Sequence, residues 1–128
     1  MVSIVVVSHS EKLATGVVDL VRMMAKEVKI ATAGGLEDGS HGTSFDKINK
    51  AIDEVYSDDG VILINDMGSA IMTSEMVIES SEKEKLFIAD CPIVEGTLEA
   101  AVLAENGNSI EEIINELKNV GSMSKTGL

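Results

Sequence analysis

The residues best suited to chemistry are a histidine and an aspartate that each follow an apolar run. His9 comes after Ile4-Val5-Val6-Val7-Ser8, and Asp66 comes after Val61-Ile62-Leu63-Ile64-Asn65. A neutral imidazole nitrogen is a nucleophile. A carboxylate on the other ring nitrogen fixes the tautomer and aims the free nitrogen outward. The pair therefore predicts a histidine that carries a phosphoryl group, with Asp66 orienting its ring.

Three residues beside this pair are candidates for binding the phosphoryl group: Ser10, Gly68 and Ser69. Helices are expected to begin after His9 and after Gly68, and helix N-termini present unpaired N–H groups and partial positive charge. Gly68 permits close approach of the backbone, and Ser69 adds a hydroxyl. One helix dipole contributes only ~0.3–1 kcal/mol, so several donors must act together. The residues alone leave open a purely structural His9 and a turn at 66–69 that only caps a helix.

Two other polar segments are weaker candidates. His41 lies in the Gly- and Ser-rich loop 34–42, where we expect it to be exposed to solvent. If that loop folds over the pocket, His41, Thr43 or Ser44 is available to contact a phosphate or a partner. Asp58-Asp59 precedes the third expected strand, at the opposite end of the sheet, and is interpreted as a solvated turn.

Strand and helix patterns alternate along the chain, which favours an α/β domain with a mainly parallel, open, four-stranded sheet and helices on both faces. We expect one domain over residues 1–128 and strand order 2-1-3-4, which places the topological switch point between the first and third strands, where such sheets bind ligands. The expected strands are 3–7, 28–33, 61–64 and 86–89. The expected helices are 11–27, one that starts near residue 43, one that follows the turn 65–70 and runs to about residue 81, 95–105, and a last one after Ser109.

The helix patterns also predict buried faces and caps. In the first helix we expect Ser10 as N-cap and a buried stripe of Leu13, Val17, Leu20, Val21 and Met24. The second helix is expected to be capped by Thr43, with Asp46 in the place of the usual Glu, and to bury Phe45, Ile48, Ile52 and Val55. Ser109 and Glu112 form the pattern of a capping box for the last helix. The tail 121–128 has no strong pattern, and it either frays or pairs with another subunit.

Composition narrows the function classes. Aromatic residues make up 2% of the 128 residues, so the core is expected to consist of Val, Ile, Leu, Ala and the seven Met. The net charge of −12 argues against nucleic acid as a partner. The single cysteine, Cys91, rules out an internal disulfide and a cysteine metal cluster, and we interpret it as a small buried apolar residue. No leader or membrane-spanning run is evident, so we expect a cytoplasmic protein without metal or cofactor.

Several motifs resemble one known family. Val7-Ser8-His9-Ser10, followed by Leu13-Ala14-Thr15-Gly16, resembles the phosphorylation site of mannose-type phosphotransferase-system (PTS) IIA domains. Asp66-Met67-Gly68-Ser69-Ala70 and Pro92-Ile93-Val94-Glu95-Gly96 resemble the phosphocarrier subunits of phosphoenolpyruvate-dependent dihydroxyacetone kinases, as does Gly42-Thr43-Ser44 with Ile48 and Ala51-Ile52. The resemblance covers nearly the whole chain. Met67 stands where Leu is common in the family.

This resemblance implies a homodimeric phosphotransferase. Phospho-HPr would pass its phosphoryl group to Nε2 of His9, with Asp66 as the partner of the ring. The phosphohistidine would then phosphorylate ADP on the nucleotide-binding kinase subunit, while a third subunit holds dihydroxyacetone. Some family members carry fused HPr-like and enzyme I-like domains, and this chain is too short for them. We therefore expect the donor to be a separate protein.

Three other functions are weighed against this one. A IIA component of a mannose-type sugar permease would use the same histidine with a membrane-associated IIB partner. A non-catalytic anion-binding regulatory module on this fold would keep its function after His9→Ala. A response-regulator receiver is disfavoured, because the first strand ends in His9 rather than in acidic residues.

Overall fold

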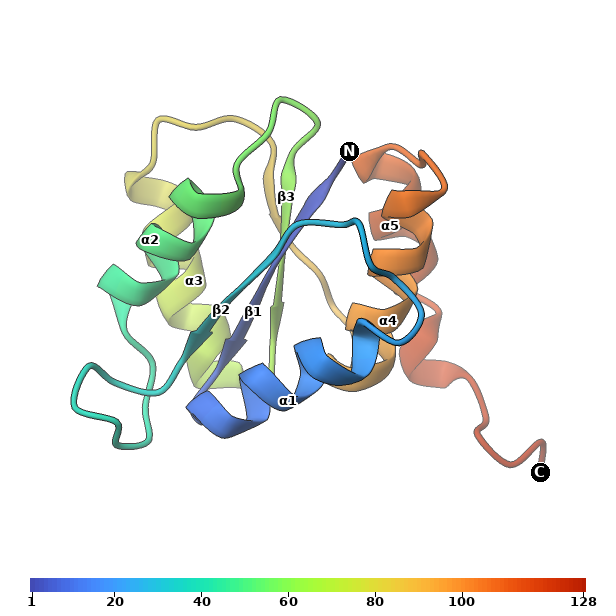
Figure 1. Cartoon of the computed structure of the whole chain (residues 1–128), viewed down its shortest axis with the longest axis horizontal. Coiled ribbons are helices and arrows are strands. Elements are labelled where there is room, and N and C mark those ends of the chain that lie inside the picture. The colour runs from blue at the N-terminus through green and yellow to red at the C-terminus, as the bar shows by residue number, and fades with distance from the viewer.

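The sheet has the predicted strand order. The computed structural model describes residues 1–128 and contains one four-stranded sheet of order β2-β1-β3-β4. Figure 1 shows β2, β1 and β3 next to one another in that order. All three neighbouring pairs are parallel. The strands are β1 (Ser3–Ser8), β2 (Ile30–Gly34), β3 (Val61–Asn65) and β4 (Leu86–Ile88), and every strand end lies within two residues of its prediction.

Helices cover both faces of the sheet, as predicted. They are α1 (Glu11–Val21), α2 (Phe45–Val55), α3 (Gly68–Ser80), α4 (Ile93–Glu105) and α5 (Ile110–Leu117), followed by a 3₁₀ turn at Val120–Ser122. Helices α1, α4 and α5 lie on one side of the sheet, and α2 and α3 lie on the other (Figure 1). One core cluster lies between the sheet and α1, α4 and α5, and a second lies between the sheet and α2 and α3. None of these helices combines the length and the apolarity needed to cross a membrane.

The two central strands are apolar throughout because both of their faces are covered. Along β1, Ile4 and Val6 point into the first cluster, whereas Val5 and Val7 point into the second. All four are completely buried. Because both faces of β1 and β3 are covered, the ends of these strands hold the residues that follow them in fixed positions.

The first helix differs from its prediction in length and in orientation. It ends at Val21 instead of Glu27, and it buries Ala14, Val17 and Val21. Three residues of the predicted stripe are largely exposed: Leu13 at 40%, Leu20 at 48% and Met24 at 69%. The small Ala14 lets α1 approach the sheet closely, which rotates the buried stripe by one residue. The Arg22 guanidinium donates to the carbonyl oxygens of Ala25 and Val28 in the turn after the helix.

The prediction that methionine fills the core is wrong. All seven Met residues are more than half exposed, and both core clusters consist of Val, Ile, Leu and Ala. These branched and small aliphatic side chains fill the space between the sheet and the helices.

The helix caps are partly as predicted. The capping box of Ser109 and Glu112 is present at α5, and Ser10 caps α1. The N-cap of α2 is Ser44, whose hydroxyl accepts from the Lys47 N–H, and not Thr43. Helix α4 begins two residues earlier than predicted, at Ile93, with Pro92 as its N-cap. The tail after Ser122 is exposed, and its Lys125 forms an ion pair with Glu95.

Candidate functional site

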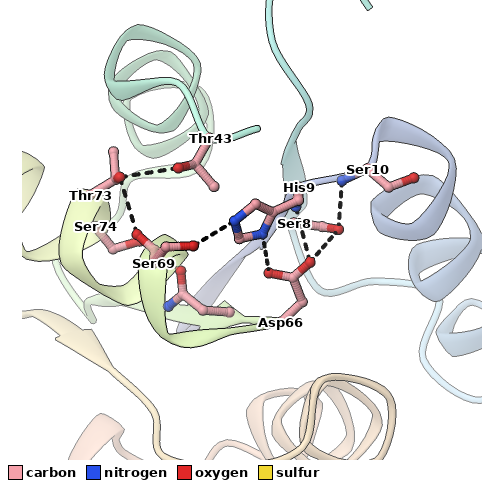
Figure 2. Close-up of polar contacts among 9 residues, drawn as sticks. Ser8, His9, Ser10, Thr43, Asp66, Ser69, Thr73 and Ser74 are labelled. Carbon is pink, nitrogen blue, oxygen red and sulfur yellow. Dashed lines mark hydrogen bonds and ion pairs between the residues drawn. The ribbon is translucent and has the colours of Figure 1, made fainter. Parts of the chain in front are cut away.

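His9 and Asp66 lie side by side at the carboxyl ends of β1 and β3. Val7 pairs with Asn65 in the parallel register, so the two residues that follow meet at the switch point between the central strands. Nδ1 of His9 lies 3.0 Å from Oδ1 of Asp66 (Figure 2). The His9 backbone N–H donates to Oδ2 of the same carboxylate at 3.0 Å, and the Ser8 hydroxyl donates to it at 2.9 Å. The Asp66 carboxylate therefore holds both the imidazole ring and the main chain of His9.

The Asp66 carboxylate is kept in its charged form. Its side chain is only 8% exposed, and this burial is the largest single influence and acts to raise the pKa. Hydrogen bonds from the His9 N–H, the His9 ring and the Ser8 hydroxyl together outweigh burial, and the pKa lies below its ordinary value. A charged carboxylate accepts a hydrogen bond from Nδ1–H, so the lone pair of a neutral His9 ring lies on Nε2.

Ser69, at the start of α3, contacts the other ring nitrogen. Its hydroxyl lies 2.6 Å from Nε2 and donates to it when Nδ1 carries the proton (Figure 2). Met67, the N-cap of α3, makes no side-chain capping hydrogen bond, and Gly68 is exposed with open space around its Cα. The N-terminus of α3 therefore offers N–H groups and partial positive charge next to Nε2.

Ser10 has a different part in the arrangement. Its hydroxyl oxygen accepts from the Leu13 N–H at 3.2 Å, and its own N–H donates to the Ser8 hydroxyl at 3.0 Å. It thus caps α1, which begins directly after His9. A contact between Ser10 and a phosphoryl group stays a prediction.

The loop after β2 is fastened to the strand end that carries His9. Gly35 N–H donates to the Ser8 carbonyl, and Gly42 N–H donates to the His9 carbonyl, both at 3.0 Å. This attachment brings the Thr43 hydroxyl to 3.1 Å from that of Thr73, which donates at 3.3 Å to the Ser69 carbonyl (Figure 2). Thr43 is one of the contacts predicted from the sequence, whereas Thr73 is not, although its spacing of four from Ser69 indicates the same helix face. His41 is exposed, as predicted.

A buried pair outside the predicted set ties α3 to the sheet. The Ser74 hydroxyl donates to Oδ1 of Asn65 at 2.8 Å, and both side chains are buried. Nδ2 of Asn65 has no hydrogen-bond partner. Because Asn65 ends β3 and precedes Asp66, this bond holds the first turns of α3 against the strand that positions the carboxylate. The sequence feature that could have identified this pair is the polar Asn65 at the end of an otherwise apolar strand.

The remaining chemical candidates lie outside this cluster. Cys91 is partly buried, and burial together with the charge of Asp90 raises the pKa of its thiol to about 11, so it is a poor nucleophile at neutral pH. The carboxylate of Asp59 pairs with the amino group of Met1, at the opposite edge of the sheet from His9. Cys91 is therefore unreactive as predicted but less buried than expected. Asp58 and Asp59 are exposed as predicted, although Asp59 is also ion-paired.

Comparison with known proteins identifies the class. The model of the EIIA-man family, described as "PTS system fructose IIA component", matches residues 3–114. Because the match covers most of the chain, the chain belongs to this family.

Within the family, the curated relatives carry one name, DhaM. The chain is 41% identical over 115 residues to the PTS-dependent dihydroxyacetone kinase phosphotransferase subunit DhaM of Lactococcus lactis, covering 90% of this chain and 92% of that protein. It is 42% identical to a phosphoryl donor subunit DhaM of Listeria innocua, over 91% and 93% of the two chains. In Escherichia coli the DhaM relative is 40% identical, and the match spans 26% of its length. These relatives confirm the resemblance inferred from the motifs.

Solved structures agree on the fold. A crystal structure described as a protein of unknown function superposes with a TM-score of 0.86 at 30% identity, over 96% of this chain and 97% of the other. A PTS component EIIA from Streptococcus agalactiae gives a TM-score of 0.73 over 98% of both chains. At 12% identity, the second comparison supports the fold alone.

Proposed function

We propose that this chain is the phosphoryl donor subunit of a phosphoenolpyruvate-dependent dihydroxyacetone kinase. In this proposal it works as a cytoplasmic homodimer that takes a phosphoryl group from phospho-HPr onto His9. It passes the group to ADP on the nucleotide-binding kinase subunit. The observation that carries the proposal is the position of the His9 ring, with Nδ1 on the Asp66 carboxylate and Nε2 at the N-terminus of α3. Relatives named DhaM that match over nine-tenths of both chains support it.

The first transfer uses the lone pair on Nε2. In the proposed step Nε2 attacks the phosphorus atom of the donor's phosphohistidine, and the P–N bond of the donor breaks with its electron pair returning to the donor nitrogen. Nδ1 of His9 keeps its proton, so the His9 ring becomes positively charged. The Asp66 carboxylate, held charged by its hydrogen bonds, stabilises that ring.

The second transfer reverses the chemistry at Nε2. A terminal phosphate oxygen of ADP attacks the phosphorus atom, the P–Nε2 bond breaks, and the electron pair returns to the imidazole. Ser69 must give up its hydrogen bond to Nε2 before the first step, and its hydroxyl is then free to donate to a phosphoryl oxygen. The exposed Gly68 allows the phosphoryl group to reach the first N–H groups of α3.

The sugar-permease alternative has support from the description of the family model, which names a fructose IIA component. The kinase is favoured over it because the relatives that match along the whole chain are named as kinase subunits. The two functions share the phosphohistidine and differ in the acceptor, so the acceptor decides between them.

The test is intact mass with peptide mapping after incubation with phosphoenolpyruvate, enzyme I and HPr. We expect an acid-labile gain of one phosphoryl group on His9 and none in His9→Ala, which should keep its circular dichroism and melting temperature close to those of the parent protein. The phosphorylated chain should then lose the group to an ADP-loaded kinase subunit and not to a IIB protein. A folded protein that gains no mass from active donors would refute the proposal.

A further inference from the structure

A short series of hydroxyl groups leads from the loop after β2 to the phosphoryl-accepting nitrogen. The Thr43 hydroxyl lies 3.1 Å from the Thr73 hydroxyl, which donates at 3.3 Å to the Ser69 carbonyl. Ser69 in turn contacts Nε2 of His9 through its own hydroxyl. Figure 2 shows Thr43 and Ser69 on the side of the His9 ring that carries Nε2. Thr43 therefore lies beside the space that a phosphoryl group on Nε2 would enter.

The main chain holds Thr43 in this position. The preceding residue, Gly42, donates its N–H to the His9 carbonyl at 3.0 Å, and the following residue, Ser44, is the N-cap of α2. Both neighbours of Thr43 are thus fixed by hydrogen bonds. Its hydroxyl can change partner by rotation of the side chain between staggered rotamers, without movement of the loop.

Thr43 differs from the two other loop residues that the sequence offers as phosphate contacts. The Ser44 side chain is committed elsewhere, since its hydroxyl donates to the Glu37 carboxylate at 2.5 Å and accepts from the Lys47 N–H at 3.2 Å. His41 is exposed and forms none of the hydrogen bonds that surround His9. Of the three, Thr43 alone combines a position beside Ser69 with a hydroxyl that can be redirected.

Redirecting the Thr43 hydroxyl leaves no hydrogen-bond donor without a partner. Thr73 keeps its own bond to the Ser69 carbonyl and loses only the bond that it accepts from Thr43. Both threonines are partly exposed, so water can take the vacated place. A phosphoryl oxygen is negatively charged, and hydrogen bonds to charged groups are stronger than those between neutral hydroxyls. The exchange is therefore favourable once His9 carries the phosphoryl group.

The site needs such donors because its own charge is negative. The charged Asp66 carboxylate lies against the imidazole of His9, and a phosphoryl group adds close to two further negative charges. The hydrogen bonds around His9 come from hydroxyls and main-chain N–H groups, and none comes from a lysine or an arginine. Neutral donors must therefore hold the phosphoryl oxygens, and each additional hydroxyl contributes to this.

We propose that Thr43 is a phosphoryl-binding residue whose hydroxyl leaves Thr73 when His9 is phosphorylated and donates to a phosphoryl oxygen. This inference rests on the proposed function. The loop after β2 and the start of α3 then hold the phosphoryl group together, through Thr43 and Ser69. Thr73 is the partner of Thr43 in the unphosphorylated protein alone.

The test is the equilibrium of phosphoryl transfer between HPr and this chain. The ratio of the two phosphorylated proteins depends on their free states and not on how tightly they dock, so it reports contacts within the phosphorylated chain. Thr43→Val and Thr73→Val each remove one hydroxyl and keep the shape of the side chain. Thr32→Val, at an exposed position of β2, is the matched control. Intact mass gives the phosphorylated fraction of both proteins, approached from either direction.

The two valine variants should shift this equilibrium in opposite directions. Thr43→Val loses a bond to a charged group in the phosphorylated protein and only a neutral bond in the unphosphorylated one. We therefore expect a shift of about fivefold toward phospho-HPr. In Thr73→Val the bond to the Ser69 carbonyl is lost in both states and cancels, whereas the bond from Thr43 is lost in the unphosphorylated state alone. The expected shift is about two- to fivefold toward the phosphorylated chain.

Two further variants complete the test. Thr43→Ser keeps the hydroxyl and should return the equilibrium close to that of the parent protein, and Thr32→Val should leave it unchanged. The melting temperatures of all variants are compared with that of the parent protein. Thr43→Ala replaces Thr43→Val if the valine variant does not fold, and the same shift toward phospho-HPr is expected of it.

Three outcomes contradict the inference. A shift toward the phosphorylated chain in both valine variants would show that the bond between the threonines breaks without a new contact for Thr43. An equilibrium unchanged in both variants would show that this bond only fastens the loop to α3. A parent protein that takes no phosphoryl group from active phospho-HPr would refute the proposed function itself, and the role of Thr43 would fail with it.

Discussion

Two hydrogen bonds join His9 to Asp66, one from the imidazole Nδ1 and one from the backbone N–H, each 3.0 Å long. The two bonds go to different oxygens of one carboxylate, so Asp66 determines both the orientation of the ring and the path of the chain that carries it. Ser8 adds a third donor to the same carboxylate. An acceptor-only group is required at this position.

Replacing Asp66 by Asn should therefore slow phosphoryl acceptance by about tenfold or more, because an amide must turn its NH₂ group toward one of these donors. If it faces Nδ1, it favours the tautomer that carries its proton on Nε2 and lacks the nucleophilic lone pair. Rapid-quench measurement of transfer from phospho-HPr checks this. Asp58→Asn, at the exposed turn before β3, is the control. Transfer kinetics equal to those of the parent protein would refute the orienting role of Asp66.

Ser69→Ala should shift the phosphoryl equilibrium toward the donor by about fivefold, because the hydrogen bond to the charged phosphoryl group contributes roughly 1.5–3 kcal/mol and the neutral bond to Nε2 that it replaces contributes roughly 0.5–1.5 kcal/mol. The same change also frees Nε2 in the unphosphorylated protein, so the rate alone does not decide. The measurement is the ratio of phospho-HPr to phosphorylated chain at equilibrium, with Ser80→Ala at the other end of α3 as control. Ser69→Thr, which keeps the hydroxyl, should restore most of the effect. An equilibrium unaffected by Ser69→Ala would exclude a phosphate contact at this residue.

Asp66 should also make stability depend on acid pH. Its pKa is lower in the folded protein than in the unfolded chain, so the unfolded chain binds more protons between the two values. The contribution of Asp66 is fully present above the ordinary carboxyl pKa of about 4 and is lost as pH falls through the folded pKa. We expect the difference in free energy of unfolding between parent and Asp66→Asn to shrink between about pH 5 and pH 2. Urea unfolding across this pH range measures this difference in free energy of unfolding. A difference that grows as pH falls would contradict a lowered pKa of Asp66 in the folded protein.

Gly34 should not tolerate alanine. An added Cβ would lie 2.6 Å from the Glu11 Cα and 2.9 Å from the Ser10 carbonyl oxygen, both main-chain atoms. The start of α1 would have to move, which we expect to cost about 1–3 kcal/mol and to slow phosphoryl acceptance at the neighbouring His9. Gly16→Ala is the matched control, because the Cβ there meets nothing within 4 Å and alanine favours the helix by up to about 1 kcal/mol. The melting temperature should fall in Gly34→Ala and rise in Gly16→Ala. An unchanged melting temperature in Gly34→Ala would contradict the close approach of Gly34 to the start of α1.

The sequence by itself predicts the strand order, the helices on both faces and the meeting of His9 with Asp66. These predictions depend on local patterns, since a short apolar run of β-branched residues is typical of a buried strand. The chain order of strands and helices then limits the topology to few choices. The capping box at Ser109 and Glu112 is local in the same way.

Only the tertiary structure decides which face of a helix is buried and which hydroxyls reach the site. The stripe of α1 is rotated toward the small Ala14, and all seven methionines lie outside the core. The contacts from Ser69 to His9 and from Thr43 to Thr73 join residues 60 and 30 positions apart. Such contacts depend on how closely whole layers pack. That depends on the volumes of all the side chains between them, which no local pattern in the sequence records.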